Sequence, residues 1–556
     1  LALAVCLVCA WFTGCGREGD AYRGADLYAR TAASICGYAP DGTFFEGSLA
    51  DGAKEVGLFY FNWLGQHPDE QAGIYDISAL EESAPEAIFA TDSDVSPMNE
   101  YHFWGQPLYG YYSSTDEWVI RKHVEMFVNA GIDFLGLDAT NAVLYEDSYE
   151  ALFSVLGEFR RQGFDYPRVT FLTNTSSRKT VFSLYETYYS DPGNDWLWLY
   201  EDGKPFIVLQ RADFDLNDPA VSAVVDHFSY RHVQWPDVEP FEGSFPWMSY
   251  DYPQFDHSGV MSVSAAQQTA GAMSRSGSRG RGYDYAAGAN TEEGIAACSN
   301  YRAQWATALA DEDVRTVFLT GWNEWMALKL PDGDSACFID QFDYGFSRDL
   351  EPSLREDGDA YYRQTVASVQ AFKGTGAGVA PLKKHELGLE DDLAQLFAEN
   401  RAARYADPAG DTAPRSHAGA AGGLVYTEDT GRNDIVCVNV ANDRDSLYIL
   451  VECAEEITAP ADSRWLNIEL LCGGETYTLN RAGTGVLSGG GQDRQCETQL
   501  RGNRFWVRVP REWLGEGEDR CCIRVRDNVD PDALLASYRQ GDSAPLGDLY
   551  YSYRFA

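Results

Sequence analysis

Between residues 52 and 374, short apolar runs alternate with segments of helical periodicity. The helical segments include 116–130, 149–162, 292–310 and 361–373. Eight strand-like runs are predicted at 56–61, 131–138, 168–173, 205–210, 227–232, 247–251, 259–264 and 315–321. Strands that alternate with helices indicate a parallel sheet, and eight such units predict a (β/α)8 barrel of the TIM type. A doubly wound sheet is the alternative, but residues 62–66 (NWLGQ) are not the glycine-rich loop that usually follows its first strand.

From about residue 423 the pattern changes to alternating strands separated by turns. The predicted strands are 435–440, 446–451, 465–471, 476–480, 504–509, 522–527 and 549–555. This spacing predicts a C-terminal antiparallel β-sandwich over 423–556. Residues 375–422 are rich in Gly and Ala around a helical segment at 389–404, and we interpret them as a linker or docking segment. Residues 16–51 are expected to be a tether and lead-in to the barrel at 52–374.

The first residues, LALAVCLVCAWFTGC, resemble a bacterial lipoprotein signal peptide over 1–15, with Cys15 as the lipidated residue. The apolar run is too short to span a bilayer. No Met or basic segment precedes it, so we expect the true start to lie upstream. An ordinary cleaved secretory peptide is the alternative. Both predict an extracytoplasmic protein at the bacterial cell surface or in the periplasm, and the first predicts membrane attachment only through the lipid.

Charge and cysteine usage exclude several classes of partner. The formal net charge of −42 argues against nucleic acid or an anionic membrane, and a solvated acidic surface is its simplest explanation. Nine cysteines follow Cys15 without metal-type spacing, so most are expected to be small buried apolar residues. We expect a monomer with no cofactor and no metal.

The segment 320–325 (TGWNEW) carries the strongest chemical signal, because it places a carboxylate between two tryptophans at the end of a predicted strand. Indole faces suit the apolar side of a sugar ring, and their low dielectric raises the pKa of a carboxyl group. The plainer alternative is a strand end whose tryptophans only pack. In a barrel, chemistry collects at the C-terminal ends of the strands.

Those strand ends supply amides, aromatic rings and carboxylates, which suit hydroxyl groups and sugar rings. The predicted substrate-binding residues are Tyr60, Trp63, His67, Asn141, Asn174, Gln210, Arg231, Trp235, Tyr250, Asp251, Trp322, Asn323, Trp325 and Asp340. His67 and His232 are expected to be hydrogen-bonding residues rather than metal ligands, since no metal-spaced partner accompanies either.

Hydrolysis of a glycoside usually needs two carboxyl groups. Glu324 is predicted as the acid or acid/base, and Asp138 as the second carboxylate. The alternative for Asp138 is a helix N-cap or a loop hydrogen-bonder. Asp251 and Asp340 are rivals: Asp251 as a ligand of a sugar hydroxyl, and Asp340 as a substrate ligand or as a brace of the rim through Arg348.

Three motifs, 59–63 (FYFNW), 130–134 (AGIDF) and 322–325 (WNEW), resemble the barrel enzymes of glycoside hydrolase families 99 and 71 and the WbsX-like domains of bacterial glycan loci. The resemblance implies a (β/α)8 enzyme acting on glycans, with Glu324 in the position of a catalytic glutamate. Family 99 carries a second glutamate three residues later, where this chain has Ala327, so its mechanism is not carried over whole. The C-terminal region resembles the family 9-type carbohydrate-binding, DOMON-like sandwich in 431–435, 446–448, 465–466 and 541–553. Trp465 and Trp506 are there either sugar-stacking or core residues.

These observations predict an extracytoplasmic glycoside hydrolase that cleaves a polysaccharide or complex glycan, with endo action. The alternative is a non-catalytic, carbohydrate-binding surface lipoprotein with a degenerate barrel, which the Ala327 position favours. A WbsX-type glycan-transferring enzyme is disfavoured by the signal peptide, because nucleotide-sugar donors are cytoplasmic.

Overall fold

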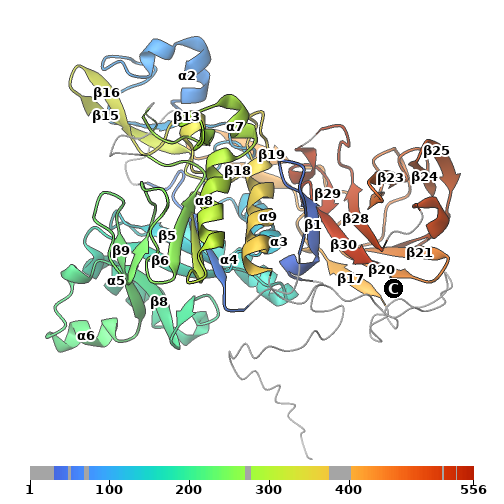
Figure 1. Cartoon of the computed structure of the whole chain (residues 1–556), viewed down its shortest axis with the longest axis horizontal. Helices are drawn as coiled ribbons and strands as arrows, with labels where there is room; N and C mark the ends of the chain where they lie inside the picture. The colour runs from blue at the N-terminus through green and yellow to red at the C-terminus, as the bar shows by residue number, and fades with distance from the viewer. Residues whose placement is uncertain are drawn as a thin grey trace, which may run out of the picture.

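A computed structural model describes residues 30–47, 52–67, 74–268, 274, 277–374, 402–515, 519–533 and 535–555. It confirms a (β/α)8 barrel followed by a C-terminal antiparallel β-sandwich, drawn in Figure 1 from blue to yellow and from orange to red. The predicted signal peptide with Cys15, residues 16–29 and 48–51 of the predicted tether, and residues 375–401 lie outside the described residues. Among the helices that are described, none combines the length and apolarity needed to cross a membrane.

The barrel consists of eight parallel strands in the order β10-β9-β8-β6-β5-β3-β14-β11, and β10 adjoins β11 to leave it nearly closed. The strands are β3 (Glu55–Tyr60), β5 (Phe134–Ala139), β6 (Arg168–Thr173), β8 (Lys204–Leu209), β9 (Ser229–Gln234), β10 (Ser244–Pro246), β11 (Val260–Ser264) and β14 (Thr316–Thr320). Most of their residues are buried, as expected for parallel strands covered by helices. The apolar runs therefore predicted the barrel because this sheet has no solvated face.

The sixth barrel strand differs from the prediction. It was expected at 247–251, whereas β10 spans only Ser244–Pro246 and pairs with β9 through three residues. The aromatic segment that follows, which includes Trp247 and Tyr250, lies beyond the end of the strand. The segment was predicted as a strand because its aromatic residues are interspersed with polar ones, and these aromatic residues are partly buried at the mouth of the barrel.

Helices surround the barrel strands (Figure 1). The described helices are α2 (Ile77–Ser83), α3 (Glu117–Ala130), α4 (Glu146–Gln162), α5 (Ser177–Leu184), α6 (Pro219–Val225), α7 (Glu292–Ala296), α8 (Ser299–Ala310) and α9 (Ala360–Lys373). Helix α3 begins where Asp116 accepts a hydrogen bond from the Trp118 amide and ends at Gly131, whose φ of 77° suits glycine. Almost all of its side chains are buried, because it packs on the barrel and also contributes to the boundary with the C-terminal region.

A three-stranded sheet lies next to the end of β14. It contains β4 (Tyr101–Phe103), β15 (Met326–Asp332) and β16 (Ser335–Ile339) in the order β16-β15-β4. Ala327 pairs with His102 in this sheet and is buried. Three two-residue or four-residue pairings complete the accessory structure: β7 (Tyr200–Glu201) with β8, β12 (Tyr283–Asp284) with β13 (Ala289–Asn290), and β18 (Arg415–Ala418) with β19 (Val425–Glu428).

The sandwich has two antiparallel sheets. One contains β17 (Ala403–Ala406), β20 (Ile435–Asn442), β21 (Ser446–Cys453), β27 (Arg504–Pro510) and β26 (Glu497–Arg501). The other contains β1 (Ile35–Tyr38), β2 (Phe44–Glu46), β22 (Asn467–Cys472), β23 (Glu475–Leu479), β24 (Val486–Gly489), β25 (Gln492–Gln495), β28 (Arg520–Asp527), β29 (Asp542–Ala544) and β30 (Tyr550–Arg554).

Two boundaries of the sandwich correct the sequence-based division. Residues 35–46 were expected in the lead-in, but β1 and β2 join the sandwich through the β1–β30 pairing, as Figure 1 shows by a blue strand beside red ones. The predicted helix 389–404 runs into β17, which pairs with β20. In both cases the partner strand is distant in the sequence, so no local pattern announced the pairing.

The aromatic and thiol groups of the sandwich are mostly internal. Trp465 is buried and donates from Nε1 to the Thr458 carbonyl at 2.8 Å. Trp506 is also buried, against Ala402, Ala441 and Leu450. Neither indole therefore presents an open face for a sugar. The nine described cysteines are free thiols, of which eight are buried and Cys337 is partly buried.

Candidate active site

Glu324 lies in the loop that follows β14, at the C-terminal end of the barrel. The loop begins at Gly321, whose φ of 100° and close approach to the Arg348 backbone leave no room for a Cβ atom. The Glu324 amide donates to Asp349 Oδ1 at 2.7 Å, and its Oε2 accepts from Arg348 Nη2 at 2.9 Å. The side chain is 5% exposed. Both its backbone and its carboxylate are thus fixed by the adjacent 341–351 segment.

Asn323 holds two strand ends together. Its Oδ1 accepts from the Phe61 amide at 3.0 Å, and its Nδ2 donates to the Phe61 carbonyl at 3.0 Å and to Tyr112 Oη at 2.9 Å. The side chain is fully buried. Asn323 was predicted to bind substrate, but two of these bonds join the end of β14 to the end of β3 and the third holds Tyr112 of the segment before α3, which makes it a structural residue.

Glu351 lies at the centre of a buried network below this loop. Its Oε1 is 2.9 Å from His123 Nε2, and its Oε2 accepts from Tyr112 Oη at 3.0 Å and from the Trp325 indole. His123 Nδ1 is in turn 3.0 Å from Tyr60 Oη. Tyr60 was predicted to bind substrate, but the network keeps it 3% exposed inside the barrel. Neither Glu351 nor His123 was predicted, because neither lies at a strand end.

The tryptophans beside Glu324 face the core rather than a ligand. Trp322 packs edge-on against Phe127 with ring centroids 4.8 Å apart, and Trp325 packs against Trp104 at 5.2 Å. Both are essentially inaccessible to solvent. Their predicted stacking role is therefore wrong, and the plainer alternative of packing applies to them. Glu324 is the member of the segment that stays a candidate for chemistry.

Arg348 organises the side of the site opposite the barrel strands. Besides Glu324, it donates from Nη1 to Gln268 Oε1 at 3.0 Å, and its guanidinium lies 5.5 Å from the ring centroid of Trp247. Asp349 beside it accepts from Gln341 Nε2 at 2.5 Å and from Ser347 Oγ at 3.2 Å. The predicted brace between Arg348 and Asp340 is thus replaced by an ion pair between Arg348 and Glu324.

The carboxyl groups around Arg348 raise one another's pKa. Burial, followed by the Asp340 charge, raises the pKa of Glu324 well above its ordinary value, although Arg348 opposes the rise. Burial and the Asp138 charge raise the pKa of Asp340 to about 6, again against Arg348. Burial raises the pKa of Asp349 to about 6 as well. Like charges in a poorly solvated site cannot all ionise, so this group retains a proton near neutral pH.

Asp138 lies near the end of β5, as predicted, and hydrogen-bond donors occupy both of its oxygens. Oδ2 accepts from Trp63 Nε1 at 2.9 Å, and Oδ1 accepts from the Thr140 amide and hydroxyl at 3.0 and 2.8 Å. The contacts to Thr140 match the loop hydrogen-bonder that was the alternative for this residue. Asp138 also orients Trp63, and its charge contributes to the pKa of Glu324.

Two groups of aromatic side chains border the carboxyl groups. In the first, Trp63 stacks on Tyr145 with centroids 5.7 Å apart and also contacts His67 and Tyr101. His67 and Tyr101 line a cavity of about 10 Å³ next to Met326. In the second, Trp235 and Trp247 meet edge to face at 4.9 Å. The indole N–H groups of both are buried without an acceptor.

The remaining predicted ligands divide into those at the mouth of the barrel and those elsewhere. Tyr250 belongs to the mouth, since the charges of Arg348 and Asp340 both act on its pKa, which burial raises. Asn141, which donates to Tyr145 Oη at 2.7 Å, and the partly exposed Asn174 and Gln210 follow β5, β6 and β8.

One predicted ligand lies away from the mouth. Arg231 is in the first half of β9 and donates to the His257 carbonyl at 2.9 Å, just before β11 begins, which is the N-terminal end of the barrel. The predicted strand ended two residues too early, and this error moved Arg231 to the wrong end, so its prediction is wrong. Asp251 is exposed and directly follows Tyr250 in the segment after β10, and its role as a ligand of a sugar hydroxyl stays a prediction.

The described side chains around Glu324 include no trio of His, Cys, Asp or Glu groups close enough to share a metal ion. The site instead places Glu324, whose pKa is raised, and Asp340 around the fixed charge of Arg348, beside aromatic side chains. That arrangement suits proton transfer to a polar, uncharged ligand.

No protein-family model and no curated protein matches the chain. Among solved structures, it is similar to the GH99 endo-alpha-mannosidase from Bacteroides thetaiotaomicron, with 16% identity, coverage of 57% of this chain and 97% of that chain, and a TM-score of 0.35. The complex of that enzyme with BIS-TRIS-propane gives a TM-score of 0.34 at the same identity and coverage. A glycoside hydrolase-like protein shares 14% identity over 60% of this chain and 99% of its own, with a TM-score of 0.28. Similarities this low do not indicate an activity.

Proposed function

We propose that this protein is a glycoside hydrolase that uses Glu324 as its proton donor. The observation that supports this most is the state of Glu324: a buried carboxyl at the C-terminal end of a barrel strand, whose pKa is raised by burial and by the Asp340 charge. A general acid must hold its proton at working pH, and a raised pKa provides this. Burial raises the pKa of its neighbour Asp340 to about 6, and we assign Asp340 as the group that is ionised when the site acts.

Glu324 and Asp340 together form the pair of carboxyl groups that glycoside cleavage needs. One proton shared by the two leaves an acid on one side and a carboxylate on the other, the division of roles found in both retaining and inverting glycosidases. Asp340 is half-buried at the mouth of the barrel, whereas donors already occupy both oxygens of Asp138. We therefore assign Asp340 as the second carboxylate, and Asp138 as the residue that orients Trp63.

The substrate of this activity is a polysaccharide or complex glycan cleaved within its chain. Trp235 and Trp247, both partly exposed, supply apolar faces for sugar rings. Trp63 and Tyr145 are buried, and Trp63 packs against the partly exposed rings of His67 and Tyr101. The signal-like sequence ending at Cys15 supports action outside the cytoplasm.

The test is a screen of polysaccharides and host-type glycans, with released oligosaccharides measured by mass spectrometry. The wild-type protein should release products from at least one glycan, and Glu324→Gln should release about 10²–10⁴-fold less. Glu312→Gln is the matched control, because that exposed carboxylate lies in the turn before β14, at the opposite end of the barrel, and it should keep wild-type activity. Equal activity in the Glu324 variant would remove the assignment.

A non-catalytic carbohydrate-binding protein is the second candidate. The buried ion pair between Glu324 and Arg348 favours it, because such a pair can be purely structural, as does Ala327 where family 99 has a glutamate. Binding of a glycan in calorimetry without any release of products over days would establish this candidate in place of the hydrolase.

A further inference from the structure

A second group of carboxylates lies between the barrel and the sandwich and uses none of the residues around Glu324. It consists of Glu125 on α3, Asp407 and Asp411 after β17, Asp434 before β20, and Asp542 at the start of β29. Ligand oxygens of Glu125, Asp407 and Asp411 lie within 4.8 Å of one another, and so do those of Asp411, Asp434 and Asp542. The two trios share Asp411, so the five residues form one cluster, the interdomain cluster.

The hydrogen bonds of the four aspartates follow one pattern: one oxygen of each is tied to the fold and the other has no partner. Asp411 accepts from Lys122 Nζ at 2.8 Å, and Asp434 accepts from the Gly410 amide at 2.9 Å. Asp542 accepts from the Ile435 amide at 2.6 Å, and Asp407 accepts from Tyr551 Oη at 3.3 Å. The second oxygen of each is buried without a hydrogen bond.

Glu125 goes further than the four aspartates, because neither of its oxygens has a hydrogen-bond partner. Both of its oxygens are buried without a hydrogen bond, and its side chain is 2% exposed. An unpaired buried carboxylate is costly, and native proteins rarely retain one without a counter-charge. Six such oxygens in one place, counted as four from the aspartates and two from Glu125, are therefore a strong indication of a missing cation.

Lys122 alone does not balance the cluster. It is the cation that pairs with Asp411, whereas five carboxylates converge there. Five carboxylates beside one ammonium group leave an excess of negative charge, which a bound cation would neutralise.

We propose that the interdomain cluster binds Ca²⁺ and that this ion fastens the sandwich to helix α3 of the barrel. Hard divalent cations take oxygen ligands, and Ca²⁺ takes six to eight of them at about 2.3–2.6 Å, so two oxygens on one ion lie no more than about 5 Å apart. The spacing of the trios agrees with this limit. The absence of His and Cys from the trios argues against Zn²⁺. Ca²⁺ fits an all-carboxylate cage better than Mg²⁺, which usually keeps several waters.

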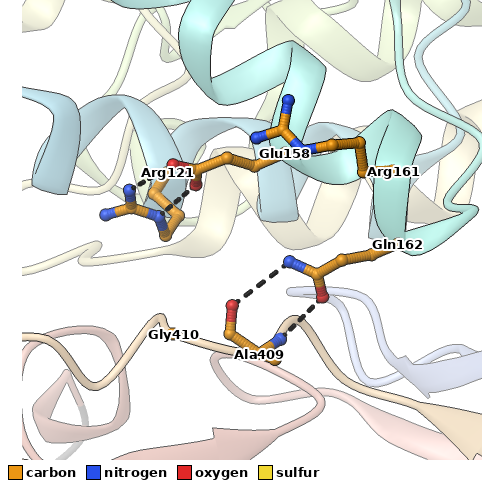
Figure 2. Close-up of a pocket in the computed structure, with 6 residues that line it drawn as sticks. All are labelled: Arg121, Glu158, Arg161, Gln162, Ala409 and Gly410. Carbon is orange, nitrogen blue, oxygen red and sulfur yellow. Dashed lines mark hydrogen bonds and ion pairs between the residues drawn. The ribbon is translucent and has the colours of Figure 1, made fainter.

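Helix α4 holds the loop between Asp407 and Asp411 in place. Gln162 of α4 holds the backbone of Ala409 with two hydrogen bonds of 2.8 and 3.2 Å, as Figure 2 shows. A cleft of about 310 Å³ next to it is lined by residues of α3 and α4 and by Gly410, whose amide donates to Asp434. The cleft therefore reaches Ala409 and Gly410, in the loop between Asp407 and Asp411, while none of the five carboxylates lines it.

Calorimetry on the full chain tests the proposal directly. Protein stripped with EGTA and dialysed into metal-free buffer is titrated with CaCl₂, and its melting temperature is measured with and without 1 mM CaCl₂. We expect at least one bound Ca²⁺ per chain and a rise in melting temperature on the order of 3–5 °C. Absence of both binding heat and a thermal shift in the wild type would overturn the proposal. An equal response to MgCl₂ would overturn the assignment of Ca²⁺.

A matched pair of variants locates the ion. Glu125→Gln removes a carboxylate that makes no hydrogen bond, and it should weaken Ca²⁺ binding at least 10-fold and remove most of the thermal shift. Asp116→Asn is the control, since this buried residue caps the same helix and pairs with Arg415 across the same boundary without joining the cluster. It should lower the melting temperature yet keep the Ca²⁺ response. Wild-type affinity in Glu125→Gln, or loss of the response in Asp116→Asn, would refute the assigned site.

Discussion

Replacing Asn323 with Ala should destabilise the barrel strongly, because its side chain joins two strand ends. The substitution leaves two buried groups without these partners, the Phe61 amide and the Phe61 carbonyl, which Asn323 now meets at 3.0 Å. The Tyr112 hydroxyl loses the donor Asn323 but keeps its hydrogen bond to Glu351. An unsatisfied buried group costs about 1–3 kcal/mol, and water entering the space left by the side chain recovers part of this. The expected loss is therefore about 2–4 kcal/mol of unfolding free energy.

Urea denaturation followed by tryptophan fluorescence measures this loss. Asn174→Ala is the control, because that partly exposed asparagine also follows a barrel strand and should change stability by no more than about 0.5 kcal/mol. If Asn323 were a substrate ligand, as its strand-end position first indicated, Asn323→Ala would keep wild-type stability and lose glycan binding. That result would refute its assignment as a structural residue.

Three further predictions concern charge and the aromatic walls. Activity should rise with pH through about 6 as Asp340 ionises and fall at higher pH as Glu324 loses its proton. Arg348→Met should move both limbs of the kcat/KM profile to higher pH, because the Arg348 charge lowers both pKa values. Limbs at unchanged pH would contradict the assignment. In EGTA the melting temperature should fall as pH rises from about 5 to 8. The pKa of Glu125, beside Lys122 and Asp411, is raised to about 8 in the folded protein, so the stability contributed by its bound proton is lost as pH rises through that value. A melting temperature that rises over this range would count against an unfilled cluster. Trp247→Ala should weaken glycan binding by about 1–3 kcal/mol in calorimetry without loss of folding, as Trp247 is partly exposed; unaltered affinity would exclude that wall.

The sequence predicted the barrel well because its parallel strands are buried on both sides. Runs such as 205–210 (PFIVLQ) are apolar at nearly every position, and they end close to where the structure ends them. The location of Glu324 at the mouth followed from the same runs. Small boundary errors had large effects on the site, however. A shift of two residues in β9 assigned Arg231 to the wrong end of the barrel.

The direction of each side chain could not be predicted from the sequence. Trp322 and Trp325 flank Glu324 in the chain, but they point into the core, and their place in the site is taken by Trp247 and Trp235 from a different strand end. Arg348 and Glu351 follow Glu324 by 24 and 27 residues in a segment without regular periodicity. Their contacts depend on how that segment returns to the barrel, which only tertiary packing determines. The interdomain cluster is similar, since its members span residues 125 to 542.

The most direct test of the proposed mechanism compares two substrates of different leaving-group ability in Glu324→Gln. Once the glycan screen has identified the sugar, its natural linkage and the corresponding dinitrophenyl glycoside are assayed side by side. A general acid matters only where the leaving group needs a proton. The account predicts a loss of about 10²–10⁴-fold on the natural linkage and nearly wild-type rates on the aryl glycoside. An equal loss on both substrates, or on neither, would contradict the role of Glu324 as the proton donor.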